Sequence, residues 1–328
     1  MDRRTFLQLA AGFSLGPISG SLPAAAQAPW PTRSVTIVVP FAPGGQADLA
    51  ARSVALGLAR TLGQSVVVDN RTGAGGAIGT AFVANGEPDG HTMLMALSAV
   101  AVLPEAERVS GRKPSYEMSQ LTPIARVLGD PNLLIVPAAS PYKTVKDLVD
   151  DAKQRPGEIA YASAGNFGAS HVCMEMFCQA AGIKLLHVPY RGGGPALAAL
   201  LGGQVALTAQ GAGPLKGYSD EGKMRVLATF GAERHSAFPD APTFMEAGYE
   251  NVVFYVWAGL FVRKGVPADV VRRLQTAVNT VMHDPEIVGI LNKAGSPPAY
   301  LDAAEFAAYI ETDSKRLIAT VHKIGKPD

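Results

Sequence analysis

The chain has 328 residues, of which 48% are hydrophobic and 17% are charged, and its formal net charge is +1. This composition predicts one large or two ordinary globular domains with a buried core, and it excludes a disordered chain. The balanced charge disfavours nucleic acid as a partner, because nucleic acid favours a basic face, and it equally disfavours electrostatic attachment to a membrane.

The amino-terminal segment has the layout of an export signal. Arg3 and Arg4 open it, a short apolar run follows, and small residues lead up to Ala26 and Ala28. This order resembles a twin-arginine signal, and the run is too short and too interrupted to span a membrane. We expect residues 1–26 to be a signal peptide, cut after Ala26 or Ala28, and the chain to reach the periplasm. The alternative is an ordinary cytoplasmic amino terminus.

From residue 35 onward, short apolar runs alternate with helical patterns. Strands are predicted over 35–40, 65–70, 91–97, 131–137, 158–165, 184–190, 205–210 and 224–230. Helices are predicted over 47–62, 78–83 and 144–154, from about Ser170, and over 195–203. Strands of this length separated by helices indicate βαβ units on parallel sheets.

The longest apolar and aromatic run is 252–262, which is longer than an ordinary strand. It predicts either two strands joined by a bend or one strand that crosses between two domains. From Pro267 the pattern is helical to the end of the chain. We therefore expect an α/β protein of two lobes, with residues 30–130 and 256–328 in lobe 1 and residues 131–255 inserted as lobe 2.

The two cysteines, Cys173 and Cys178, lie five residues apart in a predicted helix. A helix rises by about 7.5 Å over that distance, whereas a disulfide needs its Cα atoms within roughly 7 Å. We expect both to be packing residues. His171 and Glu175 share a helix face without an evident third ligand, so capping or local packing is a better interpretation than a metal site.

Enzyme motifs are absent from the sequence. No glycine turn is followed by the lysine of a P-loop, the nucleotide fingerprint is incomplete, and no hydrolase elbow occurs. A secreted enzyme acting on an organic acid would need a positioned acid, base, nucleophile or metal. We expect no catalytic residue, no metal and no cofactor.

Four glycine-rich turns stand where a predicted strand gives way to a helix: 40–48, 71–79, 163–171 and 190–197. A helix amino terminus has free N–H groups and a partial positive charge, so it favours anions. Ligands of open α/β sheets bind beyond the carboxyl ends of strands. Any α/β protein has some glycine turns, but four at such junctions favour a site for one small anion between two lobes.

The same residues resemble a known family. "VPFAPGGQADLAAR", "LGQSVVVDNRTGAGGAIGTAFVANGEPDGHTML", "HVPYRGGGPALAALLGGQV", "APTFMEAGY" and "VWAGLFVRKGVP" are similar to the Bug family of periplasmic solute receptors of tripartite tricarboxylate transporters. The resemblance runs from Trp30 to the carboxyl end. It implies a two-lobed periplasmic-binding-protein fold (type II-like), a ligand cleft between the lobes, and a helical carboxyl-terminal segment. It also implies a monomer that binds a small carboxylate and docks on membrane transporter subunits or on a sensor protein.

In that family, backbone groups and ordered waters of the glycine turns hold the carboxylate, so glycines here would let it approach the backbone. The ligand-binding residues implied by the resemblance are Phe41, Pro43, Gly44, Gly45, Asp48, Gly75, Gly76, Ser98, Ser163, Gly165, Asn166, Gly168, Ala169, Ser170, Tyr190, Arg191, Gly192, Gly193 and Gln210. Gln210 stands where the family often has an acidic side chain, and Asp48 is expected to be a helix cap or first-turn charge. We therefore expect a ligand with carboxylates and no amino group.

Overall fold

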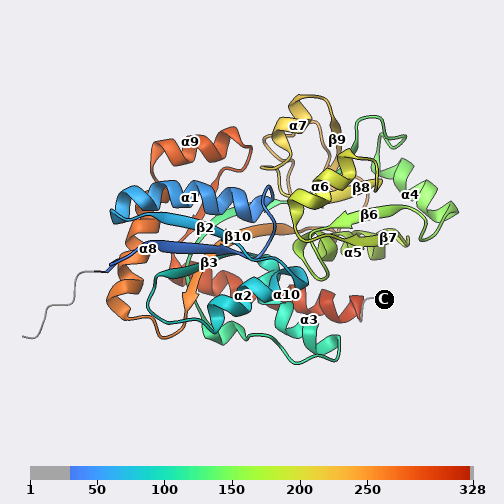
Figure 1. The fold of residues 1–328 in the computed structure, drawn as a ribbon. Helices are drawn as coiled ribbons and strands as arrows, with labels where there is room; N and C mark the ends of the chain where they lie inside the picture. The colour runs from blue at the N-terminus through green and yellow to red at the C-terminus, as the bar shows by residue number, and fades with distance from the viewer. Residues whose placement is uncertain (1–29, 326–328) are drawn as a thin grey trace, which may run out of the picture.

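The computed structural model describes residues 30–325, so the predicted signal peptide and its two cleavage positions lie outside the described residues. The described part forms two α/β lobes, each built on its own β-sheet (Figure 1). We call the lobe with the six-stranded sheet lobe 1 and the lobe with the five-stranded sheet lobe 2. Among residues 30–325, no helix combines the length and apolar composition needed to span a bilayer.

The sheet of lobe 1 has the strand order β11-β4-β10-β3-β1-β2. Its strands are β1 (Val35–Val39), β2 (Val66–Asn70), β3 (Thr92–Leu97), β4 (Leu121–Pro131), β10 (Tyr255–Arg263) and β11 (Pro298–Leu301). Strand β1 runs parallel to β2 and β3, while β10 is antiparallel to β3 and β4. The parallel part matches the βαβ units expected from the sequence.

The sheet of lobe 2 has the order β7-β6-β8-β5-β9. Its strands are β5 (Leu133–Pro137), β6 (Ala160–Ser163), β7 (Leu186–Pro189), β8 (Leu207–Gln210) and β9 (Met224–Thr229). Strand β6 is parallel to β7 and β8, and β5 runs antiparallel to β8 and β9. Strand β9 is therefore an edge of this sheet.

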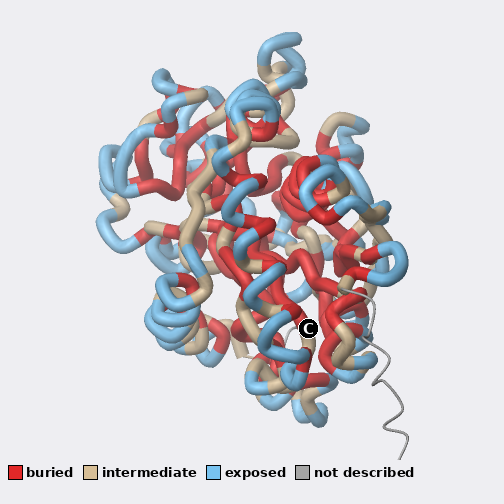
Figure 2. Tube along the Cα trace, turned by 90° about the vertical axis from the view of Figure 1, so that its left-hand side faces the viewer, coloured by how far each residue is buried: buried red, intermediate tan, exposed pale blue. Residues whose placement is uncertain are grey.

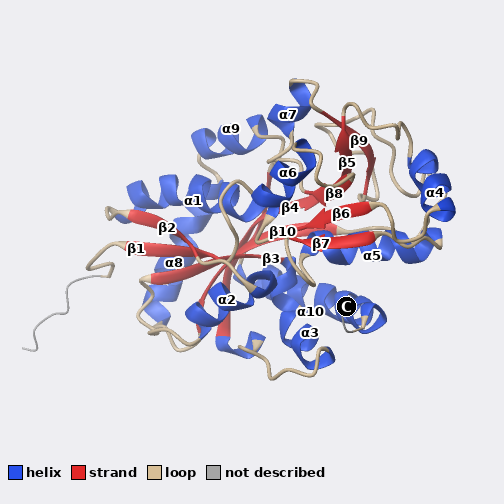
Figure 3. Ribbon diagram, turned by 45° about the vertical axis from the view of Figure 1, so that its right-hand side comes forward, coloured by secondary structure: helices blue, strands red, loops and turns tan. Residues whose placement is uncertain are grey.

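Helices cover the sheets of both lobes (Figure 3). Those of lobe 1 are α1 (Gln46–Leu62), α2 (Ala77–Ala84), α3 (Leu103–Val109), α8 (Ala268–Met282), α9 (Pro285–Lys293) and α10 (Ala303–Ile324). Those of lobe 2 are α4 (Val145–Gln154), α5 (Ala169–Ala181), α6 (Gly193–Leu201) and α7 (Lys216–Asp220). Short 3-10 turns occur at η1 (Ala74–Gly76), η2 (Ser98–Ala101) and η3 (Met118–Gln120). The long α10 confirms the predicted helical carboxyl-terminal segment.

The chain passes between the lobes at Asn132, which separates β4 from β5, and again just before β10. The Asn132 N–H donates to the Phe254 carbonyl at 3.4 Å, and the Phe254 N–H donates to the Phe230 carbonyl at 2.8 Å. The Phe230 N–H donates to the Asn132 carbonyl at 2.8 Å, so the two crossings lie side by side. This backbone cluster is the natural place for a hinge.

Of the two predictions for the run 252–262, two strands joined by a bend is wrong, and one strand that crosses between the domains is right only in that the run itself crosses. Residues Tyr255–Arg263 make one nine-residue strand that stays in the lobe 1 sheet, and only the residues before it cross. The strand is long because it lies inside the sheet, where β3 and β4 pair with its two edges and helices cover its faces. Strands β4 and β11, and helices α3 and α7, were not predicted.

Buried residues run through the interior of both lobes, while exposed residues lie on their outer surfaces (Figure 2). Cys173 and Cys178 are both buried free thiols, as predicted. In lobe 1, Trp257 is fully buried beside Phe306 with ring centroids 5.1 Å apart. Its Nε1–H donates to Asp313 Oδ2 at 2.9 Å, which ties α10 to β10.

Substituting Trp257→Phe is expected to lower the free energy of unfolding by about 2 kcal/mol, because a buried carboxylate oxygen of Asp313 loses its donor. Arg316 still donates to the other oxygen at 3.0 Å, which limits the loss. Urea unfolding monitored by far-ultraviolet circular dichroism measures the change. A free energy within error of the parent would show that this bond does not hold α10 on the sheet.

Candidate ligand-binding cleft

The glycine turn after β1 faces the glycine turn before α6 across the gap between the lobes. The Ala42 N–H donates to the Arg191 carbonyl at 2.9 Å, a direct backbone bond between lobes. A Cβ atom added at Gly194 would lie 2.1 Å from the Pro43 carbonyl oxygen, and one at Gly45 would lie 3.3 Å from the Gly193 nitrogen. Side chains at these positions would hold the lobes apart.

The other two turns meet in the same way. A Cβ atom at Gly75 would lie 2.4 Å from the Asn166 carbonyl oxygen, and one at Gly165 would lie 2.9 Å from the Gly75 Cα. Gly165 also has φ +130°, a conformation that residues with a Cβ rarely adopt. The structure thus brings the four predicted turns together, in pairs, with the lobes closed on each other.

A cavity of about 30 Å³ lies between the closed lobes. It is lined by Phe41, Gly45, Gln46, Ala47, Leu97, Asn132, Ala164, Ala169, Ser170, Gly193, Ala209, Gln210, Gly211 and Val256. Space of that size holds one or two water molecules. A small organic acid therefore fits only if the lobes separate in part around the hinge.

Three helices begin at the wall of this cavity: α1 at Gln46, α5 at Ala169 and α6 at Gly193. None of the three has a side chain that caps its amino terminus. Helices α4, α9 and α10 begin elsewhere and are capped by Thr144, Asp284 and Asp302, while α2, α3, α7 and α8 also begin elsewhere without a side-chain cap. What distinguishes the cavity is that three uncapped helices begin at one place. Uncapped N–H groups with the positive ends of three helix dipoles favour an anion here.

Within residues 30–325, no charged side chain lines the cavity. Asp48, in the first turn of α1, accepts the Gly44 N–H at 3.1 Å and two bonds from Arg52 at 2.9 and 3.0 Å. Burial raises the pKa of Asp48, but the hydrogen bonds from Arg52, Asn70 and Gly44 outweigh it and bring the pKa below its usual value. Asp48 is therefore a first-turn charge paired with Arg52, one of the two roles expected from the sequence, and it does not line the cavity.

Gln46 is held in a buried polar cluster at the cavity wall. Its Nε2 donates to Asp130 Oδ2 at 2.7 Å and to Ser296 Oγ at 3.0 Å. Burial raises the pKa of Asp130 to about 6, against the opposite effect of hydrogen bonds from Ser296 and Gln46. The cluster joins α1, the end of strand β4 and the segment before β11, next to the hinge.

The turn after β6 rests on a pair of stacked histidines. The rings of His171 and His187 lie 3.9 Å apart at 5°, and His171 Nδ1 accepts the Phe167 N–H at 2.9 Å. His187 Nε2 lies 2.6 Å from the Ser163 hydroxyl. His171 is thus a packing residue that anchors the turn before α5, and local packing is one of the two roles preferred from the sequence. Glu175 accepts the Tyr161 hydroxyl at 2.8 Å.

Of the predicted ligand-binding residues, six line the cavity: Phe41, Gly45, Ala169, Ser170, Gly193 and Gln210. The others do not reach it in this closed arrangement: Pro43, Gly44, Gly75, Gly165, Asn166, Arg191 and Gly192 form the contacts between lobes, and Asp48, Gly76, Ser98, Ser163, Gly168 and Tyr190 lie beside the turns. The Ser98 hydroxyl is buried without a hydrogen-bond partner, while the Tyr190 hydroxyl bonds to Gln204 away from the cavity.

Eight lining residues were not among the predicted ligand-binding residues: Gln46, Ala47, Leu97, Asn132, Ala164, Ala209, Gly211 and Val256. Gln46, Ala47 and Ala164 had a local signal, because they lie in the predicted glycine turns 40–48 and 163–171. Asn132 and Val256 belong to the two crossings. They join the cavity through tertiary structure alone.

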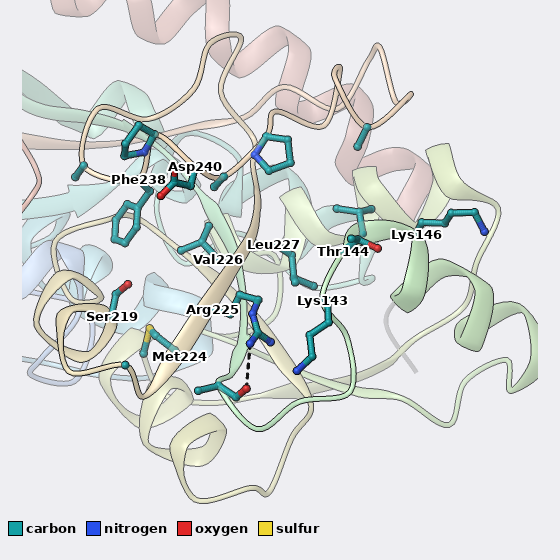
Figure 4. Close-up of a pocket in the computed structure, with 18 of the residues that line it drawn as sticks. Lys143, Thr144, Lys146, Ser219, Met224, Arg225, Val226, Leu227, Phe238 and Asp240 are labelled. Atoms are coloured by element: carbon teal, nitrogen blue, oxygen red, sulfur yellow. Dashed lines mark hydrogen bonds between the residues drawn. The ribbon is translucent and has the colours of Figure 1, made fainter.

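A larger hollow of about 1000 Å³ lies on the outer edge of lobe 2 (Figure 4). It runs along the edge strand β9 between Lys143, at the start of α4, and Phe238. Arg225 bonds to the Ala138 carbonyl at 3.3 Å within it. No predicted ligand-binding residue lines this groove, and none of the three uncapped helices begins there. The cavity between the lobes is therefore the candidate site.

A two-sheet α/β fold with a cleft between its lobes is the fold of periplasmic binding proteins. Three solved structures are similar over nearly the whole chain. The periplasmic binding protein BugD is 32% identical, with a TM-score of 0.84, over 90% of this chain and 98% of its own. MatC from Rhodopseudomonas palustris with bound malate is 29% identical, with a TM-score of 0.84, over 89% and 100%. R. palustris Rpa4515 with adipate is 31% identical, with a TM-score of 0.83, over 89% and 98%.

The family model described as the tripartite tricarboxylate transporter family receptor matches residues 50–326. The chain therefore belongs to the tripartite tricarboxylate transporter receptors, the family that the sequence motifs had indicated. The predicted type II-like periplasmic-binding-protein fold is confirmed as well. Receptors of this family bind solutes for transport, and the chain shares that function class.

Proposed function

We propose that this chain is a non-catalytic periplasmic receptor that captures a small dicarboxylate or related acid and delivers it to the membrane subunits of its transporter. The observation that carries the proposal is the meeting of three uncapped helix amino termini at one buried cavity without charged side chains. The relatives solved with malate and adipate support this ligand class. The lobe boundaries that we propose are 30–130 with 256–328, and 131–255.

The proposed ligand-binding residues are those of the four turns together with Ser98 and Gln210. Backbone N–H groups hold carboxylates without needing a cationic side chain, because the dipoles of the helices supply the positive potential. A thermal-shift screen of mono-, di- and tricarboxylates tests the proposal, since a ligand that binds only the folded state raises the unfolding temperature. No shift with any carboxylate, and turnover of one of them, would each count against a receptor of this kind.

Succinate is expected to bind about tenfold or more tightly than aspartate, because a buried ammonium group without an anionic partner is costly. No acidic side chain lines the cavity, Gln210 donates to the Gly193 carbonyl at 2.8 Å, and Asp48 is committed to Arg52. Titration calorimetry with this matched pair measures the difference. Tighter binding of aspartate would contradict the expectation and would point to Asp48 as the ammonium partner.

A further inference from the structure

One acceptor in the cavity wall has no donor. Gln46 is only 5% exposed, it lines the cavity, and its Oε1 is fully buried with no hydrogen-bond partner. The orientation of the amide is fixed, because Nε2 donates to both Asp130 and Ser296 on the other side. A buried acceptor left unpaired is unfavourable, and natural proteins rarely keep one without a reason.

Two glycines of lobe 2 lie against this oxygen. Cβ atoms added at Gly211 and Gly213 would lie 2.9 and 3.1 Å from Gln46 Oε1. Gly211 also lines the cavity, so the oxygen lies at the junction of the cavity and the lobe contact. When the lobes separate in part to admit a ligand, these two glycines withdraw and Oε1 faces the ligand.

The polar side chains of the cavity are bonded elsewhere, although each keeps one hydrogen free to donate. Asn132 Nδ2 donates to Cys173 Sγ at 3.1 Å, and Gln210 Nε2 donates to the Gly193 carbonyl at 2.8 Å. Ser170 Oγ accepts the Ala164 N–H at 2.8 Å. Within residues 30–325 none of them bonds to Gln46 Oε1, so a donor from the ligand or from a water molecule would complete Gln46.

We infer that Gln46 Oε1 accepts a hydrogen bond from a hydroxyl group of the ligand, so that the receptor selects hydroxycarboxylates over the same carboxylates without the hydroxyl. This inference rests on the proposed function and specifies its ligand class. The carboxylates of the ligand cannot donate to Oε1 at neutral pH, and the uncapped helix amino termini already attract them. In a ligand that carries a hydroxyl next to a carboxylate, the hydroxyl can donate to Oε1 while the carboxylate binds the helix amino termini. Asp130 acts as a positioning residue, because it turns Nε2 away from the cavity.

The test is titration calorimetry of the full chain with L-malate, D-malate and succinate, which differ only at the hydroxyl. The parent protein is expected to bind one malate enantiomer about tenfold or more tightly than succinate, because succinate leaves Oε1 unpaired. Gln46→Met keeps the length of the side chain and removes the acceptor. In that variant we expect the preference to fall to about twofold or less.

Equal affinity of the parent for succinate and for both malate enantiomers would overturn the inference, and a water molecule would then be the donor. That result would leave the proposed function intact, whereas no binding of any of the three acids would count against both. A hydroxyl preference that survives Gln46→Met would also overturn it. Where Gln46→Met does not fold, the parent protein still decides against the inference if neither malate enantiomer binds more tightly than succinate.

Discussion

Gly194→Ala is expected to weaken carboxylate binding by about 100-fold or more while the protein remains folded, because its methyl group blocks the contact between the Pro43 and Gly194 turns, which we expect to persist when the rest of the cleft opens in part around a ligand. A Cβ atom at position 194 would lie 2.1 Å from the Pro43 carbonyl oxygen on the other lobe. That neighbour is backbone and cannot rotate aside. These two turns must therefore stay apart. Because the binding-competent arrangement is then rarely populated, the measured affinity falls in proportion to its population.

The matched control is Gly217→Ala. Gly217 and Gly194 are each the second residue of a helix in lobe 2, and a Cβ atom at Gly217 would meet nothing within 4 Å. Alanine is a better helix former than glycine, so neither variant is expected to lose stability within its lobe. Solution scattering at saturating ligand should show compaction for the parent and Gly217→Ala only. Parental affinity in Gly194→Ala would show that ligand binding does not need this degree of closure.

This geometry gives the glycine pair Gly44-Gly45 a second role. From the sequence, the pair suggested close approach of a carboxylate to the backbone, and that role remains a prediction. In the structure, the same pair packs against Gly193 and Gly194 of the opposite turn. Two backbones that approach so closely need glycine on both sides. The sequence alone does not show which other segment a glycine turn contacts in the fold.

The strands and helices that were predicted well have strong local patterns. The strand after residue 34 and the helix after Gly45 are examples, since an unbroken β-branched run and an alanine-rich amphipathic segment each favour one structure. Strand β4 was missed because Pro123, Arg126 and Gly129 interrupt its apolar pattern. It forms because β10 and β11 pair with its edges, and the Arg126 Nε donates to the Ala299 carbonyl at 2.8 Å.

The candidate site also has parts that local sequence predicts and parts that it does not. Its turns could be predicted because each is a local strand-to-helix junction. The cluster around Gln46 could not, because Asp130 lies 84 residues away in the chain and Ser296 lies 250 residues away. No short-range pattern connects them. Sequence therefore indicated the turns where we propose that an anion binds, and it left out the side chain that we propose to distinguish one acid from another.

The histidine pair beneath the turn after β6 makes the stability of the fold depend on pH. Burial lowers the pKa of His171 to about 3, with repulsion from His187 as the second cause, and burial lowers the pKa of His187 to about 4. In the unfolded chain both groups titrate at about 6.5. Between these values the unfolded state binds more protons, so stability is complete above about pH 6.5 and falls as the pH falls.

Asp130 changes the stability of the fold with pH in the opposite direction to the histidines. Its pKa is raised to about 6 by burial, so between about pH 6 and its unfolded value the folded state binds the extra proton and gains stability as the pH falls. The two histidines outweigh one carboxyl group. Lowering the pH from 7 to 5 is expected to reduce the free energy of unfolding by on the order of 3 kcal/mol, at 1.36 kcal/mol per pKa unit.

His171→Asn separates the histidine pair from every other titrating group. The asparagine Oδ1 can still accept the Phe167 N–H, so the turn keeps its anchor, but one of the two buried bases is gone. Urea unfolding at pH 7, 6 and 5 should show a pH dependence reduced by well over half in this variant, because the raised pKa of Asp130 offsets most of what His187 alone contributes. The control is Leu58→Ala, a fully buried substitution in α1 that lowers stability without removing a titratable group and should keep the parental pH dependence.

If His171→Asn loses as much stability between pH 7 and 5 as the parent does, the stacked pair is not the origin of the acid sensitivity. Acid unfolding would then have to start from the carboxylates that are ion-paired in the folded state.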